Sequence, residues 1–165
     1  MVPRLLPLSD EQQGLLQSLH THLATWSIPR TNPPRPSVGV GRSCTFGRVK
    51  KRFGGREYKD GVWNTKKPEI WKLLQAYGAT VPVAWTSIQI NQNCVCAKHR
   101  DKNNVGDSYL VSVGDYTGGE LVVEGVPYNT KEAGIVFNGS ELEHWNNEIT
   151  SGNKWSIVFF PAPIK

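Results

Sequence analysis

The chain has 165 residues, which is the usual size of one compact domain and argues against two separate domains. Hydrophobic residues make up 38% of it, and 16 Gly and 11 Pro divide it into short segments, as in a strand-rich fold with many turns. The formal net charge is +5, and 3 cysteines, an odd number, argue against a secreted disulfide framework, so we expect a reducing, intracellular setting.

The first residues predict no targeting or membrane segment. Residues 1–8 hold only a few apolar side chains, and Pro3 and Pro7 interrupt them, so they form neither the core of a signal peptide nor a membrane span. We therefore expect a soluble protein, nuclear or cytoplasmic, that does not bind membranes. The oligomeric state stays open.

Two helices are expected before the strand-rich part of the chain. Ser9 and Gln12 have the spacing of a capping box, and apolar residues then recur along one helical face until Pro29. The recurring residues are Leu15, Leu16, Leu19, Leu23 and Trp26. Pro68 suits the first turn of a second helix and Gly78 suits its end, and this helix should pack against a sheet.

The segment between these helices is expected to be less regular. Residues 31–36 should run extended, because their prolines cannot sustain helical hydrogen bonding. Residues 38–49 mix apolar and polar side chains in a way that is compatible with a strand. Residues 50–67 are basic, aromatic and glycine-containing, which predicts a surface loop.

Beyond residue 80 the pattern becomes typical of strands. Residues 88–91 alternate between isoleucine and a polar amide, and further β-prone runs are separated by turn residues. The runs cover residues 109–113, 121–123, 135–137 and 157–160, and the turns cover residues 114–115, 117–119 and 138–139. We predict a mainly β fold with buttressing helices, a jelly roll, in which residues 1–80 form a helical buttress and basic loop and residues 81–165 form the jelly-roll core.

A candidate metal site lies in the second half of the chain. His99 and Asp101 are two residues apart, so on a strand or at its end they point to the same side. His144 is the only other histidine outside the first helix. Two imidazoles and one carboxylate leave positions open, as Fe(II) needs to hold a bidentate keto acid together with dioxygen. An open zinc site could use the same set, although the helical HExxH spacing is absent.

Lys154 is the candidate for binding an acidic cosubstrate. It stands ten residues after His144, and Ser156 shares its face at the entry to an apolar strand. A lysine that enters a core strand is costly unless its charge is compensated, and a bound dicarboxylate would supply the compensation. The alternative is that the ammonium group reaches solvent at the end of the strand.

These residues together resemble the signature of the Fe(II)/2-oxoglutarate-dependent dioxygenases, over roughly residues 86–160. The resemblance implies a double-stranded β-helix of the cupin type, with His99, Asp101 and His144 as metal ligands and catalytic residues. It also implies Fe(II), 2-oxoglutarate and dioxygen as cofactors, with ascorbate as a further candidate, and keto-acid binding by Lys154 and Ser156. Decarboxylation of the keto acid is coupled in this family to hydroxylation of a C–H bond.

Two branches of the family compete. Residues 86–123 resemble the TET/JBP-like oxygenases, whose DNA modification is oxidation of the methyl group of 5-methylpyrimidines, although that branch commonly has arginine in place of Lys154. Residues 118–123 and 144–160 resemble the prolyl 4-hydroxylase branch, where lysine is familiar, although the tyrosine shortly before HxD is absent. A prolyl or other protein hydroxylase is therefore the rival function. A catalytically inactive binding module for nucleic acid or protein is the alternative of another class.

Charge favours nucleic acid as the partner. Lysines and arginines of residues 50–67 are interleaved with aromatic side chains, and together they could neutralise phosphates and stack an exposed base. The same pattern also suits a solvated basic loop whose aromatic rings pack on the core. The candidate substrate-contacting residues are Asn91, Asn93, Asn103, Arg52 and Tyr58.

Two further clusters receive no catalytic role. Cys94 and Cys96 precede His99 in a C-x-C-x-x-H pattern, but one histidine cannot serve two metals, so we interpret both thiols as small apolar groups on the inner face of a strand. His20 and His22 project from different faces of the first helix and are expected at the surface.

Overall fold

The computed structural model describes residues 2–30, 41–51, 57–101 and 105–163. Within these ranges, no helix has the length and apolar character needed to cross a membrane. The extended connector predicted for residues 31–36 lies outside the described residues.

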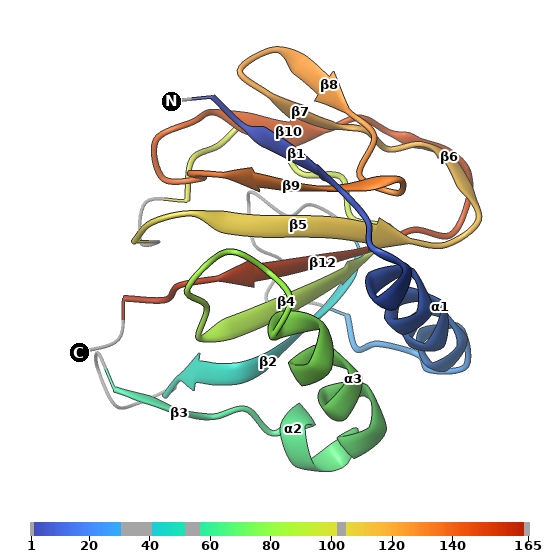
Figure 1. Cartoon of the computed structure of the whole chain (residues 1–165), viewed down its shortest axis with the longest axis vertical. Coiled ribbons are helices and arrows are strands. Elements are labelled where there is room, and N and C mark those ends of the chain that lie inside the picture. Colours follow the sequence, from blue (N-terminus) through green and yellow to red (C-terminus); the bar gives the residue numbers. More distant parts are fainter. Residues whose placement is uncertain (1, 31–40, 52–56, 102–104, 164–165) are drawn as a thin grey trace.

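A seven-stranded antiparallel sheet forms the centre of the molecule (Figure 1). In spatial order the strands are β1 (Arg4–Pro7), β9 (Ala133–Phe137), β5 (Ser108–Val113), β12 (Trp155–Phe160), β4 (Ser87–Gln92), β2 (Arg42–Lys50) and β3 (Tyr58–Asp60). Apart from β2 and β3, its neighbouring strands are not consecutive in the sequence, so most of the sheet is assembled by crossovers.

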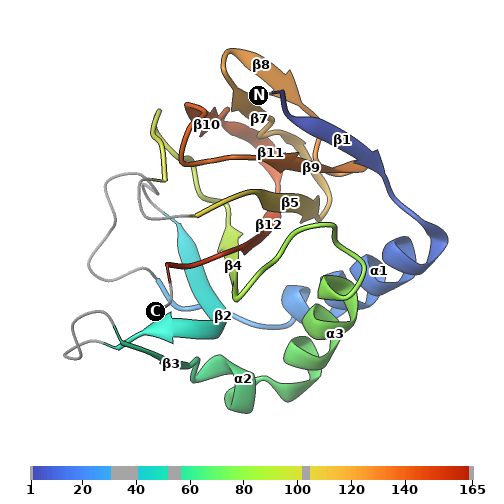
Figure 2. The same ribbon diagram turned by 60° about the vertical axis from the view of Figure 1, so that its left-hand side comes forward.

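Two smaller antiparallel sheets complete the β layers. The three-stranded sheet consists of β10 (His144–Asn146), β7 (Leu121–Val123) and β8 (Val126–Tyr128), and the two-stranded sheet consists of β11 (Ile149–Gly152) and β6 (Tyr116–Gly118). Figure 2 shows the three-stranded sheet on one side of the molecule and the helices gathered on the other. This arrangement confirms the predicted mainly β jelly roll with buttressing helices.

The helices α1 (Asp10–Ala24) and α3 (Pro68–Gly78) cover one face of the large sheet. Ser9 caps α1 in the predicted capping box with Gln12, and Pro68 occupies the first turn of α3 as expected. Their apolar faces join the strands in one core cluster. Burying each large side chain of this cluster contributes about 1.5 to 3 kcal/mol, so the helices fix the sheet on which the site is built.

The predicted loop over residues 50–67 was wrong in part, because its described residues include β3 and the short helix α2 (Trp63–Lys66). β3 depends on its pairing with β2, and α2 depends on side-chain contacts outside its own segment. The side chain of Asn64 accepts a hydrogen bond from the backbone N–H of Gly47 and donates one to its carbonyl oxygen, at 2.8 and 3.1 Å. Trp63 packs against Trp26, with ring centroids 5.1 Å apart. Local propensity carries no signal for either contact.

Other element boundaries also differ from the predictions. Residues 116–118, predicted as part of a turn, form β6, which is held by its pairing with β11. The N-terminal segment contributes β1, whose register with β9 pairs Leu5 with Ile135. Residues 1–80 therefore supply three strands to the large sheet as well as the helical buttress. The first helix ends at Ala24, several residues before Pro29.

Candidate metal centre and cavity

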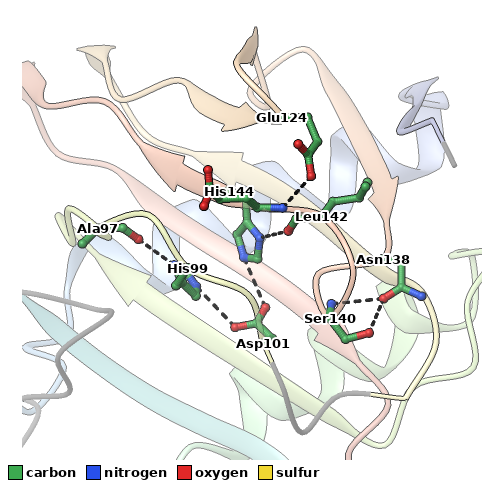
Figure 3. A network of polar contacts seen from close by, with 9 residues as sticks. Ala97, His99, Asp101, Glu124, Asn138, Ser140, Leu142 and His144 are labelled. Carbon is green, nitrogen blue, oxygen red and sulfur yellow. Dashed lines mark hydrogen bonds and ion pairs between the residues drawn. The ribbon is translucent and has the colours of Figure 1, made fainter.

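His99, Asp101 and His144 are brought together by two segments that run side by side. The chain leaves β4 and passes His99, which forms a two-way backbone bridge with His144 at the start of β10, with N···O distances of 3.1 and 3.0 Å. The backbone N–H of Asp101 donates to the carbonyl oxygen of Gly139 at 2.8 Å. One potential ligand atom from each of the three side chains lies within 4.8 Å of the other two (Figure 3).

Backbone carbonyl groups orient both imidazole rings. Nδ1 of His99 lies 2.7 Å from the carbonyl oxygen of Ala97, and Nδ1 of His144 lies 2.9 Å from that of Leu142 (Figure 3). A carbonyl oxygen only accepts, so each Nδ1 carries the proton and donates it. Both Nε2 atoms then turn to Asp101, at 3.3 Å for His99 and 3.2 Å for His144. This is the arrangement by which proteins direct imidazole lone pairs at a cation.

The carboxylate of Asp101 is suited to stay charged. Its burial would raise its pKa, but the close imidazoles of His144 and His99 outweigh burial and hold the pKa well below its ordinary range. Gly139 allows this packing, because a Cβ atom there would come within 2.7 Å of Oδ2 of Asp101. Asn138 fixes the turn by accepting hydrogen bonds from the N–H and the hydroxyl of Ser140, at 3.0 and 2.6 Å.

The three groups open onto a cavity of about 180 Å³ on the face of the large sheet opposite the helices. Strand alternation supplies its wall, because residues of β4, β5 and β12 that point away from the helices point into it. The lining residues are Gln89, Asn91, Cys94, Cys96, His99, Asp101, Ser108, Leu110, Leu121, Phe137, His144, Asn146, Ser156, Val158 and Phe160. The cavity therefore joins the three ligand candidates to apolar and neutral polar groups.

Two features of the wall bear on ligand binding. Phe137 packs edge-on against His144, with ring centroids 5.1 Å apart, and shields that imidazole from water. The hydroxyl of Ser108 is buried and has no hydrogen-bond partner among the described residues. A buried hydroxyl without a partner costs about 1 to 3 kcal/mol, which a polar ligand in the cavity would offset.

Lys154 is buried immediately before β12, with only 2% of its surface exposed, so the alternative of a solvent-reaching ammonium group is wrong. Its ammonium group donates to the carbonyl oxygen of Gly119 and lies 5.7 Å from the ring centroid of Tyr116. Burial lowers the pKa of Lys154 to about 8, against smaller opposing effects of Cys96 and Glu120. Ser156 lines the cavity from the same side of the chain, whereas Lys154 itself is not among the lining residues.

The two cysteines face the cavity as predicted, but from a different element. Cys94 and Cys96 follow β4 in a segment without regular strand structure, so their predicted place on a strand was wrong. Besides the bridge between His99 and His144, the N–H of Asn146 in β10 donates to the carbonyl oxygen of Cys96 in this segment at 3.3 Å. The prediction that His20 lies at the surface was also wrong in part, because its half-buried ring packs 5.5 Å from that of Trp155.

The candidate substrate residues have different outcomes. Asn91 lines the cavity. Asn93 is not among the lining residues, and its side chain instead accepts a hydrogen bond from the backbone N–H of Lys154. Tyr58 lies half-buried on β3, at the edge of the large sheet and not among the lining residues. Arg52 and Asn103 lie outside the described residues. Sequence reasoning missed Gln89, Ser108 and Asn146, although the alternation of residues 88–91 could have identified Gln89.

Much of the described basic charge of residues 48–67 is engaged within the protein. Arg48 pairs with Asp60 at 2.8 Å and Lys51 pairs with Glu57 at 2.9 Å. The ammonium group of Lys67 lies 4.9 Å from the ring centroid of Trp26. Trp63 is half-buried at the edge of the apolar core. Basic residues also stand next to the site, where Lys98 lies 4.8 Å from the ring centroid of Trp145.

The chain shares the fold of a solved 2OG-Fe(II) oxygenase family protein. Many solved structures share this fold. NgTET1 in complex with 5mC DNA is 14% identical, with a TM-score of 0.65 over 97% of this chain and 72% of that chain. A 2OG-Fe(II) oxygenase family protein from Burkholderia pseudomallei is 17% identical, with a TM-score of 0.61 over 98% and 85%.

The third structure, a prolyl-4-hydroxylase from Pseudomonas putida, is 12% identical, with a TM-score of 0.52 over 98% of this chain and 91% of that chain. No protein-family model matches the sequence, and no curated protein matches it. The likeness is therefore one of fold, and it confirms the fold that the HxD signature implied.

Proposed function

We propose that the protein is an Fe(II)/2-oxoglutarate-dependent oxygenase that hydroxylates a C–H bond. The observation that carries the proposal is the convergence of His99, Asp101 and His144, with ligand atoms within 4.8 Å of one another, at a cavity in this fold. The donor set fits Fe(II), because two imidazoles and a carboxylate leave positions for a keto acid and dioxygen. Bound Fe(II) would supply the redox chemistry that converts 2-oxoglutarate and O2 into succinate and CO2. One oxygen atom would be inserted into the substrate C–H bond in the same reaction.

The residues of the chain would bind and orient the reactants. Lys154 immediately precedes β12, and Ser156 is the second residue of that strand. Together they would hold the distal carboxylate of 2-oxoglutarate. Asn91 and Gln89 would offer amide hydrogen bonds to the keto acid or to an edge of the substrate. Phe137 would keep water from the His144 side of the site.

The substrate we propose is the methyl group of a 5-methylpyrimidine in nucleic acid. Three observations support it: the net charge of +5, the basic side chain of Lys98 beside the site, and the shared fold with NgTET1, which was solved in complex with 5mC DNA. A base in a duplex would have to leave the stack to reach the cavity. The second candidate is a prolyl or other protein hydroxylase, favoured by the lysine at position 154 and by the shared fold with the prolyl-4-hydroxylase.

The test incubates the protein with Fe(II), 2-oxoglutarate, ascorbate and either a 5-methylcytosine oligonucleotide or a proline-containing peptide. We expect a gain of one oxygen atom in the methylated oligonucleotide, detected by mass spectrometry, in step with succinate formation. An unmethylated oligonucleotide of the same sequence is the control. Hydroxylation of the peptide alone would show that the protein is a protein hydroxylase and would contradict the nucleic-acid substrate. Iron-independent nucleic-acid binding without succinate formation would make it a binding module.

A further inference from the structure

Asn93 stands at the point where the chain leaves the large sheet for the metal-centre segment. The pairing of β4 with β12 ends at Gln92 and Trp155, so Asn93 and Lys154 come next on the two strands. Asn93 has a φ angle of 55°, in the left-handed region that asparagine adopts more readily than most residues. This conformation turns the chain out of the sheet toward Cys94 and, further along, His99.

The same residue holds the backbone of Lys154 from both sides. The N–H of Asn93 donates to the carbonyl oxygen of Lys154 at 2.9 Å, and the N–H of Lys154 donates to Oδ1 of Asn93 at 2.8 Å. Nδ2 of Asn93 donates to Oδ1 of Asn153 at 2.9 Å. The side chain thus replaces the sheet bond that the turned backbone of Asn93 can no longer provide.

We propose that Asn93 is a positioning residue for cosubstrate binding, which fixes the backbone of Lys154 so that its ammonium group meets the distal carboxylate of 2-oxoglutarate. The inference rests on the proposed function and assigns Asn93 a different role from the substrate contact predicted from sequence. Both polar atoms of its amide are engaged with Asn153 and Lys154, and the residue is not among those that line the cavity. It acts through Lys154 and touches no reactant.

The ammonium group depends on this anchor because its surroundings are narrow. A Cβ atom at Gly119 would lie 3.2 Å from Cδ of Lys154, so the side chain passes close against that turn. The carbonyl oxygen of Gly119 accepts its hydrogen bond. A shift of the Lys154 backbone would therefore displace a charged group that has little room to adjust. The metal ligands, held by the bridge between His99 and His144, would keep their places.

Three variants test the inference. Asn93→Gly keeps a residue suited to the left-handed conformation and removes only the side chain, whereas Asn93→Asp retains an oxygen that can accept from Lys154. Asn153→Ala is the matched control, because it removes the partner of Nδ2 and leaves the bond to Lys154. Each variant, loaded with Mn(II) in place of iron, is titrated calorimetrically with 2-oxoglutarate. Hydrogen exchange at the backbone amide of Lys154 reports the hydrogen bond from that amide to Oδ1 of Asn93.

For Asn93→Gly we expect 2-oxoglutarate to bind on the order of tenfold more weakly, as when supporting partners of a ligand-binding group are removed. The Lys154 amide should exchange faster, Mn(II) affinity should stay unchanged, and kcat at saturating keto acid should stay near that of the wild type. Asn93→Asp and Asn153→Ala should bind the keto acid within about twofold of the wild type. This split between KM and kcat distinguishes positioning from general damage to the fold.

Two results would overturn the inference alone: wild-type keto-acid affinity in Asn93→Gly, or parallel loss of Mn(II) and keto-acid affinity in that variant. A wild-type protein that binds Mn(II) but no 2-oxoglutarate would instead remove the proposed function, and the inference with it. The two failures are therefore separable in one set of titrations.

Discussion

The same strands form the helix-covered face and the cavity face of the large sheet, but the two faces carry different kinds of side chain. On β4, Ile88 and Ile90 are fully buried toward the helices, while Gln89 and Asn91 line the cavity. On β12, Phe159 points to the helices and Ser156 to the cavity. The helix-covered face stabilises the fold by apolar packing. The cavity face has less apolar packing and presents polar groups to a ligand. Substitutions on the two faces should therefore separate activity from stability.

The largest effect should come from the cavity face. Asp101→Ala removes the only carboxylate among the three ligand candidates, so we expect at least about a thousandfold loss of turnover together with weak iron binding. Stability to urea should fall only by the loss of the contacts of Asp101 with His99 and His144, because the side chain supports no apolar packing. Asp107→Ala, which removes an exposed carboxylate from the same connecting segment, is the control and should behave like the wild type. Retained turnover in Asp101→Ala would contradict the assignment of the metal centre.

The helix-covered face should show the reverse pattern. Phe159 is fully buried and contacts the rings of Tyr77, Trp85 and Tyr109. Phe159→Ala should lower the free energy of unfolding by about 3 to 5 kcal/mol, whereas Phe159→Leu should cost less because it leaves a smaller cavity. Keto-acid affinity of the molecules that stay folded should remain unchanged in a titration below the unfolding transition. A specific loss of that affinity would show that the two faces are not separate.

The contrast also explains what could be predicted from the sequence. The strand β4 could be predicted because alternation of apolar and polar residues is a local pattern. The ligand set could be predicted because the spacing of His99, Asp101 and His144 matches a known signature. The strand β1 was missed because its pairing with the distant β9 creates it. The elements β3 and α2 were missed because pairing with β2, or a contact such as that between Asn64 and Gly47, creates them. The place of Asn93 could not be inferred, since its partner Lys154 is distant in the sequence.

Lys154 belongs to neither face completely, and its removal should have an intermediate effect. Lys154→Ala should weaken 2-oxoglutarate binding by about 10- to 100-fold and leave Mn(II) affinity unchanged, because a charged partner of the keto acid is lost. Lys131→Ala is the matched control: Lys131 also lies over the ring of Tyr116, at 4.4 Å, but is exposed. Calorimetric titration measures both variants. Wild-type affinity in Lys154→Ala would remove this residue from the site.

The charge of Lys154 predicts opposite pH trends for binding and stability. Burial lowers its folded pKa to about 8 from an ordinary value of 10.5, so the folded chain loses this proton at lower pH than the unfolded chain does. Keto-acid affinity should fall about tenfold per pH unit above this folded pKa, because the anion loses its cation. The contribution of Lys154 to stability should instead rise over the same range, since the penalty for burying the charge disappears. Both trends should vanish in Lys154→Ala, and an affinity that is flat from pH 7 to 10 would contradict the pairing.

The smallest effect sharpens the comparison within the cavity face itself. Ser108 on β5 carries a buried hydroxyl without a partner among the described residues, beside the neighbouring strand residue Phe137. Ser108→Ala removes that uncompensated polar group, so the free energy of unfolding of the ligand-free protein should rise by about 1 kcal/mol in urea denaturation. Ser112→Ala is the contrasting variant, because its hydroxyl is bonded to that of Thr130 at 2.7 Å, and it should destabilise the protein. If Ser108→Ala destabilised the protein as much as Ser112→Ala does, the hydroxyl would have a structural partner, and the cavity face would not be sacrificing stability at this position to receive a ligand.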